Sequence, residues 1–249
     1  MTIHDQARQG FEHGADAYER GRPGYPPKAI RWLERRLELG PGSTVVDVGA
    51  GTGKLTRALL ESGATVVAVE PVEAMRAVLE RAVPEARALN GTAEALPVPD
   101  GSADAIVVAQ AFHWFDGPAA LAEFHRVLRP DGRMALIWNR RLREQPLWRA
   151  LSEITEPYRR DTPAHYSGEW RESVACTELF TAVDELEVPV EQDLDADELV
   201  DRIGSTSFIA ALPDAELTKV LARIRAVADE AGGRVRLGYV TEAYVYVRV

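Results

Sequence analysis

The sequence predicts an α/β fold in which helices cover both faces of a mostly parallel β-sheet. Short apolar, β-branched runs alternate along the chain with longer stretches of helical periodicity, which is the order that builds parallel sheets. The turn sequences "LGPGS", "VPDGS" and "RPDG" each precede an expected strand. With 249 residues and 46% apolar composition, the chain is long enough for one large domain. We therefore expect a single domain over residues 1–249.

The individual elements follow from these patterns. Runs rich in valine and alanine predict strands at 44–48, 65–69, 105–109, 133–138, 183–190 and 239–247, with a weaker strand at 86–90. Helical periodicity predicts helices at 27–39, 54–62, 73–83, 118–128 and 214–231. From 140 to 180 the pattern loosens over a stretch too long for a plain connection. We expect residues 140–180 to form a helical cover or lid after the fifth strand, with a dimer contact as the alternative.

Composition and charge limit the classes of partner. A formal net charge of −10 would repel a phosphate backbone, which favours a small-molecule substrate over nucleic acid. No apolar run reaches the roughly 18–20 residues of a membrane span, and the opening residues lack the order of a signal peptide. We expect no membrane partner, a cytoplasmic location, and a monomer or homodimer. No metal is expected, because Cys176 shows no zinc-like spacing with the five histidines, His4, His13, His113, His125 and His165.

The segment "VVDVGAGTGKLT", residues 45–56, carries the strongest functional signal. A strand followed directly by a glycine turn and a helix presents free backbone N–H groups at the carboxyl edge of the sheet, where adenosine-type ligands bind. The glycines are Gly49, Gly51 and Gly53, whereas a dinucleotide fingerprint, G-x-G-x-x-G, would have its third glycine at Lys54. The segment therefore predicts an adenosine-type ligand but fits a dinucleotide poorly.

Two acids at strand ends narrow the choice of ligand. Asp47 precedes the glycines, where it would meet a pyrophosphate with a repulsive charge. S-adenosylmethionine has a sulfonium, an ammonium and no phosphate, so an acid there suits its amino-acid end, directly or through water. Glu70, at the end of "TVVAVE", can accept hydrogen bonds from both ribose hydroxyls. Glu70 alone would suit a nicotinamide dinucleotide equally.

These residues resemble the first two motifs of the class I S-adenosylmethionine-dependent methyltransferases. The segments "GTAEALPVPDGSADAIVVAQAFHWF" and "EFHRVLRPDGRMAL" resemble later parts of that family. The resemblance implies a Rossmann-like, seven-stranded, mostly parallel sheet whose last strand is antiparallel. It also implies that the cofactor contacts are Asp47, Gly49, Ala50, Gly51, Gly53, Glu70, Pro71, Met75, Thr92, Ala93, Glu94 and Gln110. For Met75 core packing is the alternative reading, and for Glu94 a solvated turn acid.

The segment "QAFHWFD", residues 110–116, follows the fourth strand and is expected at the same cleft. Gln110 would lie closest to the methyl donor, and Phe112 and Trp114 are candidates for binding substrate and excluding water. His113 is the nearby candidate for a catalytic base because its ordinary pKa is about 6.5. A packing role is the alternative for His113.

The segment "ADAYERGRPGYP", residues 15–26, does not predict a continuous helix. Together with "AFHWF" and "GSTSFIAAL" it resembles the small-molecule methyltransferases that include the trans-aconitate methyltransferases. The resemblance implies that residues 1–26 close over the cofactor, with Tyr18 and Arg22 at the cofactor and Tyr25 at the substrate. Arg22, Arg140 and Arg141 are candidates for a substrate carboxylate, because guanidinium matches it with paired hydrogen bonds. Solvated surface positions are the alternative for these arginines.

We therefore expect methyl transfer from S-adenosylmethionine to a small-molecule acceptor, with a carboxylate or hydroxyl oxygen as the first class to test. Alignment of the reacting atoms and exclusion of water would provide most of the rate. One alternative is a nicotinamide-dependent oxidoreductase, and another is a non-catalytic binding protein that keeps the pocket or only its fold. A nucleic-acid methyltransferase is a weaker third, since neither a basic stripe nor an N-P-P-Y-like loop is present.

Overall fold

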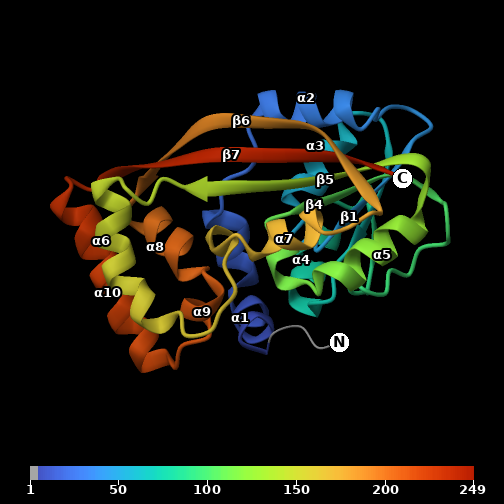
Figure 1. Cartoon of the computed structure of the whole chain (residues 1–249). Coiled ribbons are helices and arrows are strands. Elements are labelled where there is room, and N and C mark those ends of the chain that lie inside the picture. The colour runs from blue at the N-terminus through green and yellow to red at the C-terminus, as the bar shows by residue number, and fades with distance from the viewer. Residues whose placement is uncertain (1–4) are drawn as a thin grey trace.

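The strands form one continuous sheet (Figure 1). The computed structural model describes residues 5–249, with the backbone alone for residues 5–9, 11 and 13. The strands are β1 (Thr44–Val48), β2 (Thr65–Val69), β3 (Arg87–Leu89), β4 (Ala103–Ala109), β5 (Leu128–Arg141), β6 (Phe180–Asp195) and β7 (Arg234–Arg248). They lie in the order β3-β2-β1-β4-β5-β7-β6, with β1 to β5 parallel and β7 antiparallel to both β5 and β6. The predicted Rossmann-like sheet with an antiparallel last strand is confirmed.

Helices connect and flank these strands. The α-helices are α1 (Asp5–Gly21), α2 (Pro27–Arg36), α3 (Lys54–Leu60), α4 (Glu73–Ala82), α5 (Gly117–Val127), α6 (Pro146–Thr155), α7 (Glu169–Ala175), α8 (Ala196–Gly204), α9 (Ser207–Ala210) and α10 (Asp214–Glu230). Short 3₁₀ turns are η1 (Phe112–Trp114), η2 (Glu156–Tyr158) and η3 (His165–Ser167). In the part of the chain that the structure describes, no helix is both long and apolar enough to cross a bilayer.

The alternating direction of strand side chains divides the main core between two faces. Val46 packs on one face with Phe124 of α5 and Trp170 of α7, whereas Val45 packs on the other with Leu33 of α2. Successive residues of a strand point to opposite sides, so a run of valines suits a sheet that is covered twice. Val45 and Val46 are fully buried, and each such side chain contributes roughly 1.5–3 kcal/mol.

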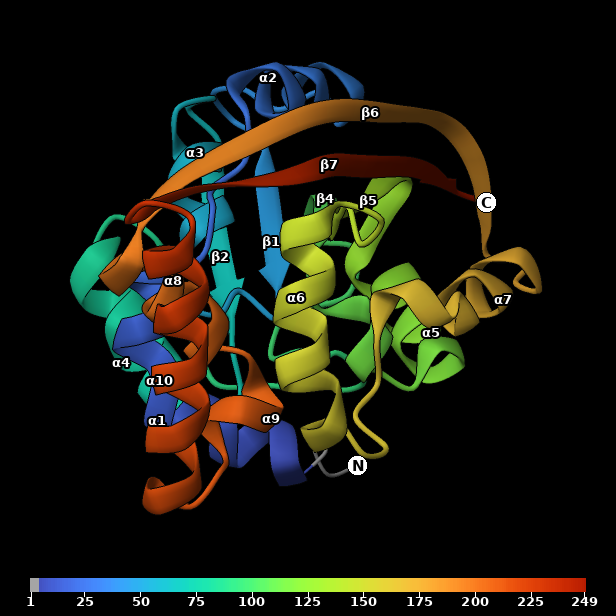
Figure 2. The same cartoon turned by 90° about the vertical axis from the view of Figure 1, so that its left-hand side faces the viewer.

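The antiparallel pair of β6 and β7 extends beyond the rest of the sheet, and a cluster of helices packs against it. The pairing of β5 with β7 ends at Arg141 and Tyr239, while residues 234–238 of β7 pair with β6 alone. Against this overhang α6, α8, α9 and α10 pack a separate core that includes Trp148, Leu237 and Ile224 (Figure 2). The cluster therefore lies beyond the carboxyl end of β5, beside the edge where the glycine turn is found.

The N-terminal segment and helix α8 compare differently with their sequence predictions. Helix α1 includes residues 15–21 and ends at Gly21, and residues 22–26 are not helical, so the expectation that no continuous helix spans 15–26 is confirmed. Residues 1–4 of the expected N-terminal cover lie outside the described residues. Helix α8 was not predicted, although it begins with a reciprocal capping box between Asp195 and Glu198, which is a recognisable start signal.

Candidate functional site

The glycine loop, residues 49–53, turns from β1 into α3 at the carboxyl end of the sheet. Gly49, Gly51 and Gly53 have φ values of 69°, 59° and 86°, a left-handed region that favours glycine. A Cβ on Gly49 would lie 2.8 Å from the Cβ of Ala111. Gly49 and Gly51 line both cavities described below. Gly53 lines neither cavity and packs close to Leu79, so the ligand contact predicted for it stays a prediction.

A cavity of about 110 Å³, here called the smaller cavity, lies beside this loop. It brings together the following residues of the predicted cofactor set: Tyr18, Gly49, Gly51, Glu70, Pro71, Met75, Thr92, Ala93, Glu94 and Gln110. Trp114 and Phe115 add aromatic walls. A mainly apolar lining with few polar groups is typical of sites for flat ring systems. Met75 is 3% exposed and also packs with Val72 and Val78, so it both lines the cavity and fills the core.

Glu70 is the buried acid of the smaller cavity. Its Oε2 accepts a hydrogen bond from the backbone N–H of Gly51 over 2.9 Å, and its Oε1 accepts one from Val72 over 2.8 Å. Burial raises the pKa of Glu70 to about 7 despite these two hydrogen bonds. A carboxylate oxygen can accept more than one hydrogen bond, so Glu70 keeps acceptor capacity for a ligand while it fixes the loop.

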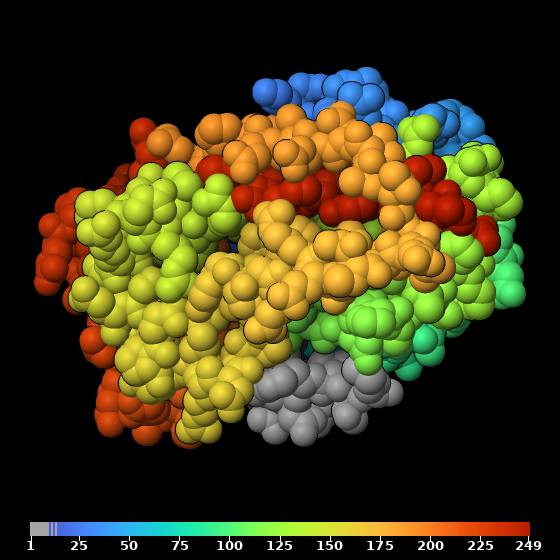
Figure 3. Space-filling view, viewed as in Figure 1, coloured from blue at the N-terminus to red at the C-terminus, as the bar shows by residue number. Residues whose placement is uncertain are grey.

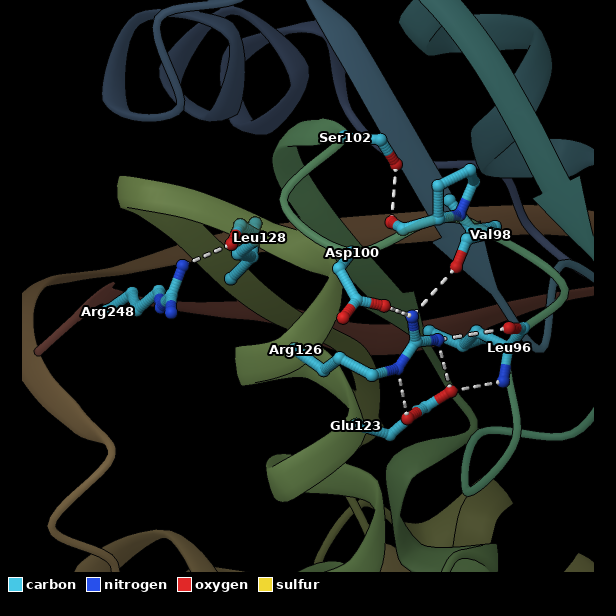
Figure 4. A network of polar contacts seen from close by, with 9 residues as sticks. Leu96, Val98, Asp100, Ser102, Glu123, Arg126, Leu128 and Arg248 are labelled. Atoms are coloured by element: carbon cyan, nitrogen blue, oxygen red, sulfur yellow. Dashed lines mark hydrogen bonds and ion pairs between the residues drawn. The ribbon is translucent and has the colours of Figure 1, made fainter.

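Arg126 of α5 is the centre of a polar network with residues 96–100 (Figure 4). Its Nη1 donates to the carbonyl of Val98 and to Asp100, and its Nη2 donates to the carbonyl of Leu96 and to Glu123. Glu123 in turn accepts the backbone N–H of Leu96 over 2.7 Å. This network ties residues 96–100 to α5, directly after the Thr92–Glu94 segment of the cavity wall.

Asp47 lies beneath the glycine loop and lines neither cavity. It is fully buried, and the Thr56 hydroxyl donates to its Oδ2 over 2.6 Å. Its Oδ1 has no hydrogen-bond partner among the described residues. Burial raises the pKa of Asp47 to about 6. A buried acceptor without a donor is costly, so the described residues leave the Oδ1 of Asp47 in an unfavourable state.

A second cavity of about 190 Å³, the larger cavity, continues from the smaller one. Both are lined by Tyr18, Gly49, Gly51, Ala109, Gln110 and Trp114. Ala50, Arg22, Tyr25 and Arg140 line only the larger cavity. In the space-filling view the chain from α6 to α7 spreads over this side of the molecule (Figure 3), and residues 162–166 line the larger cavity from that segment.

Helix α1 is joined to the glycine loop through one residue. Glu19 accepts a hydrogen bond from the Thr52 hydroxyl over 2.6 Å and one from Arg57 over 3.2 Å. The ammonium of Lys54 donates to the backbone carbonyl of Glu19 over 2.6 Å. These contacts hold the end of α1, and with it Tyr18, against the junction of the two cavities.

Gln110 occupies that junction with a strained backbone. Its φ is 59°, an uncommon value for a residue with a side chain, and such strain is frequent at functional sites. The backbone N–H of Gln110 still donates to the carbonyl of Ile137 over 2.9 Å, so β5 holds it in place. The Gln110 side chain lies beside the hydroxyl of Tyr25, whose pKa is raised well above its ordinary value, mainly by burial.

His113 lines the larger cavity in a neutral state. Burial, and next the neighbouring His165, lower the pKa of His113 to about 3. The indole N–H of Trp138 donates to its Nδ1 over 3.4 Å, which places the ring proton on Nε2. His113 is therefore arranged as a hydrogen-bond donor to the cavity rather than as a base.

Phe112 lies in the core and not at the site. It is 1% exposed, its ring centroid lies 5.9 Å from that of Phe115 and 6.4 Å from that of Phe124, and it lines neither cavity. The structure therefore places Phe112 away from the cavities and gives no support to the substrate contact predicted for it. Trp114, from the same 3₁₀ turn, lines both cavities.

Six arginines line the larger cavity, of which only Arg22, Arg140 and Arg141 were predicted as candidates. The other three are Arg143, Arg159 and Arg202. The basic run "RRLRE" in a strongly acidic chain, directly after the carboxyl end of a strand, is a signal that could have included Arg143. No local signal distinguishes Arg159 or Arg202 from the arginines of an ordinary amphipathic surface.

Three of these arginines have acidic partners. Arg140 donates to Glu242 of β7, while Arg143 and Arg159 both donate to Glu156, over distances of 2.7 to 3.0 Å. Arg140 is thus held by β7 at the cavity wall. Among the side chains that the structure describes, no group of three or more His, Cys, Asp or Glu residues is arranged to hold a metal ion; His4 and the side chain of His13 lie outside them.

Comparison with known proteins identifies the family. A family model described as a methyltransferase domain matches residues 46–136, from β1 to the middle of β5. An uncharacterized methyltransferase from Mycobacterium tuberculosis is 43% identical over 215 residues, which cover 86% of this chain and 84% of the relative. Its similarity thus extends beyond the glycine loop to most of the chain.

Solved structures agree with the fold. A structure from Anaeromyxobacter dehalogenans, assigned provisionally as a type II methyltransferase, has a TM-score of 0.66 at 24% identity and covers 90% of this chain and 97% of its own. A geranyl diphosphate methyltransferase in complex with SAM has a TM-score of 0.52 at 19% identity, covering 89% and 85%. Since the mycobacterial relative is similar over most of both lengths, this chain belongs to the methyltransferase family that carries this domain.

Proposed function

We propose that this chain transfers a methyl group from S-adenosylmethionine to a small-molecule acceptor, with a carboxylate oxygen favoured over a hydroxyl oxygen. The observation that carries the proposal is a pair of buried carboxylates at the ends of adjacent strands. Glu70 lines the smaller cavity, and Asp47 presents an unpartnered oxygen beneath the glycine loop. Both suit a ligand that is cationic and rich in donors, and a pyrophosphate would meet repulsion there.

The residues present fit this cofactor. The smaller cavity offers Thr92, Ala93 and Glu94 for the adenine, and Glu70 for the ribose hydroxyls. Asp47 would balance the ammonium of the amino-acid end. Tyr18 and Arg22 supply an aromatic face and a guanidinium, which suits the carboxylate of that end.

S-adenosylmethionine would supply a methyl group on a cationic sulfur: an electron pair of the acceptor would bond to the methyl carbon while the carbon–sulfur bond breaks and the sulfur leaves as a neutral thioether. Gln110, at the junction of the two cavities, would orient the acceptor. Tyr18 and Trp114, which line both cavities, would exclude water from the reacting atoms, so that alignment provides most of the rate.

The neutral state of His113 favours a carboxylate acceptor. A hydroxyl needs a base for its proton, and a ring with a pKa lowered to about 3 that donates through Nε2 supplies none. A carboxylate is already ionised at neutral pH, and the arginines of the larger cavity would attract it. His113 then acts as a donor that positions the acceptor.

Two segments would act as covers. Helix α1, tied to the glycine loop through Glu19, would close over the cofactor with Tyr18. Residues 140–180, which contain Arg143, Arg159 and the stretch 162–166 of the cavity wall, would close over the acceptor. Membership of the methyltransferase family weighs against the alternative that this chain is a nicotinamide-dependent oxidoreductase. The alternative of a non-catalytic binding protein differs from the proposed function in one measurable respect, because such a protein would bind the cofactor without transferring its methyl group.

A calorimetric titration with S-adenosylhomocysteine tests the cofactor, with NADH and NADPH as controls. We expect micromolar binding of the adenosyl ligand alone, lost in Asp47→Ala and Glu70→Ala. Binding should be kept in Asp184→Asn, because Asp184 lies on β6, pairs with Arg36 of α2 and lines neither cavity. Binding of NADH alone would refute the proposal. Binding of S-adenosylhomocysteine without methyl transfer to any of a panel of carboxylic acids and alcohols would favour the non-catalytic alternative.

A further inference from the structure

Three arginines of the larger cavity form a cluster without acidic partners. This arginine cluster consists of Arg22 at the end of α1, Arg141 at the end of β5 and Arg202 of α8. None of the three has a carboxylate of the described residues within 4.0 Å, whereas Arg140 pairs with Glu242, and Arg143 and Arg159 with Glu156. The cavity thus contains paired arginines and a separate group of unpaired ones.

The contacts of the cluster are all neutral. Arg22 donates to the hydroxyl and the carbonyl of Ser205 over 3.3 and 3.2 Å and lies 4.9 Å from the ring centroid of Tyr18. Arg141 has a long, 3.5 Å contact with the Thr206 hydroxyl and lies 4.9 Å from the ring centroid of Trp148. Hydroxyls, a carbonyl and aromatic faces orient a guanidinium, but they do not neutralise it.

Arg202 is the most buried member of the cluster. It is 2% exposed, its Nε donates to the Tyr239 hydroxyl over 2.7 Å, and its Nη1 is buried without a hydrogen-bond partner. A buried donor on a charged group that lacks a partner is strongly unfavourable. Arg202 therefore lines the larger cavity while one of its donors lacks a hydrogen-bond partner among the described residues.

The three charges also oppose one another. Burial, and next the charge of Arg202, lower the pKa of Arg22 to about 10. The pKa of Arg141 is lowered well below its ordinary value by burial, with Arg202 and Arg22 as the next causes. The fold holds three guanidiniums together at the expense of stability, a pattern typical of binding sites.

One cofactor carboxylate does not balance this charge. Arg22 lies beside Tyr18, which lines both cavities, and is the member placed to meet the amino-acid end of the cofactor. Arg141 and Arg202 line only the larger cavity, at the end formed by β5 and α8. Two positive charges are left there for the acceptor.

We propose that the acceptor carries an anionic oxygen group in addition to the atom that is methylated, and that Arg141 and Arg202 bind this second group. The proposal rests on the proposed function and narrows its substrate class to small molecules with at least two polar ends, one of them anionic. Guanidinium binds both carboxylate and phosphate with paired hydrogen bonds, so the second group is one of these two.

The test is calorimetry on the full chain saturated with S-adenosylhomocysteine. Succinate, with two carboxylates, is compared with butyrate, with one at the same chain length, and with inorganic phosphate. We expect succinate or phosphate to bind at least about tenfold more tightly than butyrate, since each charge-assisted pair contributes a factor of this order. The stronger of the two identifies the source of the anionic group. Equal binding of all three probes, or binding of none, would overturn the proposal.

Matched variants assign the binding to the cluster. Arg141→Gln and Arg202→Gln should each weaken the stronger anion by about tenfold or more. The conservative variants Arg141→Lys and Arg202→Lys should fall between these and the natural protein, since lysine keeps the charge but not the paired donors. Arg236→Gln is the control, because Arg236 of β7 is exposed and pairs with Glu191 and Asp193 of β6. Unchanged anion binding in the Gln variants would contradict the proposal.

Thermal unfolding separates a binding role from a structural one. Without ligand, Arg141→Met should raise the unfolding midpoint by about 2–4 °C, because one unpaired charge is removed, and the midpoint should no longer respond to the stronger anion. A lower midpoint with an unchanged anion response would mean that Arg141 supports the fold. Failure of the proposed function gives a different result from failure of the anion site: the natural protein would not bind S-adenosylhomocysteine, independently of its affinity for succinate or phosphate.

Discussion

Acid should weaken the binding of the adenosyl ligand, and Glu70 should be the main cause. Burial raises the pKa of Glu70 to about 7 and that of Asp47 to about 6. In the proposed complex, ribose hydroxyls donate to Glu70 and an ammonium faces Asp47. Both contacts favour the ionised carboxylates. The ligand therefore binds a form that the free protein loses as the pH falls below about 7.

The magnitude follows from the two pKa values. If both carboxylates titrate below pH 5 in the complex, lowering the pH from 8 to 6 costs about tenfold in affinity through Glu70 and about twofold through Asp47, or roughly twentyfold together. Binding at pH 6 then releases about 1.4 protons, of which about 0.9 come from Glu70.

Calorimetry at pH 6, 7 and 8, in buffers with different heats of ionisation, measures both quantities. Glu70→Gln should keep only the twofold dependence that Asp47 causes, while Asp184→Asn serves as the control. An affinity that does not change between pH 8 and 6, or binding at pH 6 without proton release, would refute the reasoning. Retention of the full pH dependence by Glu70→Gln would assign it to another group.

The ligand-free protein provides an independent check of the sign. Glu70 has a folded pKa above its unfolded value of about 4.5, so the folded state holds the proton to higher pH. The free energy of unfolding should therefore fall between pH 4.5 and 7, by up to about 3 kcal/mol from this group. Glu70→Gln should flatten this part of the stability curve. A rise in stability over the same range in the natural protein, relative to Glu70→Gln, would contradict the raised pKa.

Three further substitutions test the site. Gly49→Ala should abolish binding of the adenosyl ligand and lower the free energy of unfolding by about 1–3 kcal/mol. The new alanine would have a positive φ, and its Cβ would lie 2.8 Å from the Cβ of Ala111. Calorimetric binding close to that of the natural protein would show that this crowding does not occur. Phe112→Leu should lower the free energy of unfolding by about 1–1.5 kcal/mol in chemical denaturation, since Phe112 lies in the core. The dissociation constant for S-adenosylhomocysteine should stay unchanged, and a large change in it would mean that Phe112 contributes to the binding site. His113→Gln should keep the shape of the pH–rate profile between pH 6 and 8, because a ring with a pKa of about 3 does not titrate there; loss of an ionisation from the profile would identify His113 as a base.

The sheet and the glycine turn were predictable because their signals are local. The valine runs of β1 and β2 bury both faces, and the turn sequences bound them, so the predicted and observed ranges coincide at 44–48 and 65–69. The roles within "AFHWF" were not predictable from spacing in a helix or strand. Phe112–Trp114 form a 3₁₀ turn in which Phe112 is buried against Phe115 and Phe124, whereas Trp114, and Phe115 directly after the turn, line the smaller cavity.

Arg202 and Arg159 were missed for a different reason. Their positions depend on the overhang of β6 and β7, which is set by pairing between segments about 40 residues apart and leaves no mark in the local sequence around either arginine. A helix such as α8 can be recognised by its cap, but the neighbour it will pack against cannot.

The division of the two cavities along the chain has a consequence for how such a protein diversifies. The smaller cavity is built from residues 18–115, whereas most of the residues found only in the larger cavity come from positions 139–208. A recombination that exchanged the second stretch would replace the walls that select the acceptor and leave the glycine loop and Glu70 intact. Chimeras joined within β5 would therefore inherit one parent's affinity for the adenosyl ligand and the other parent's choice of acceptor.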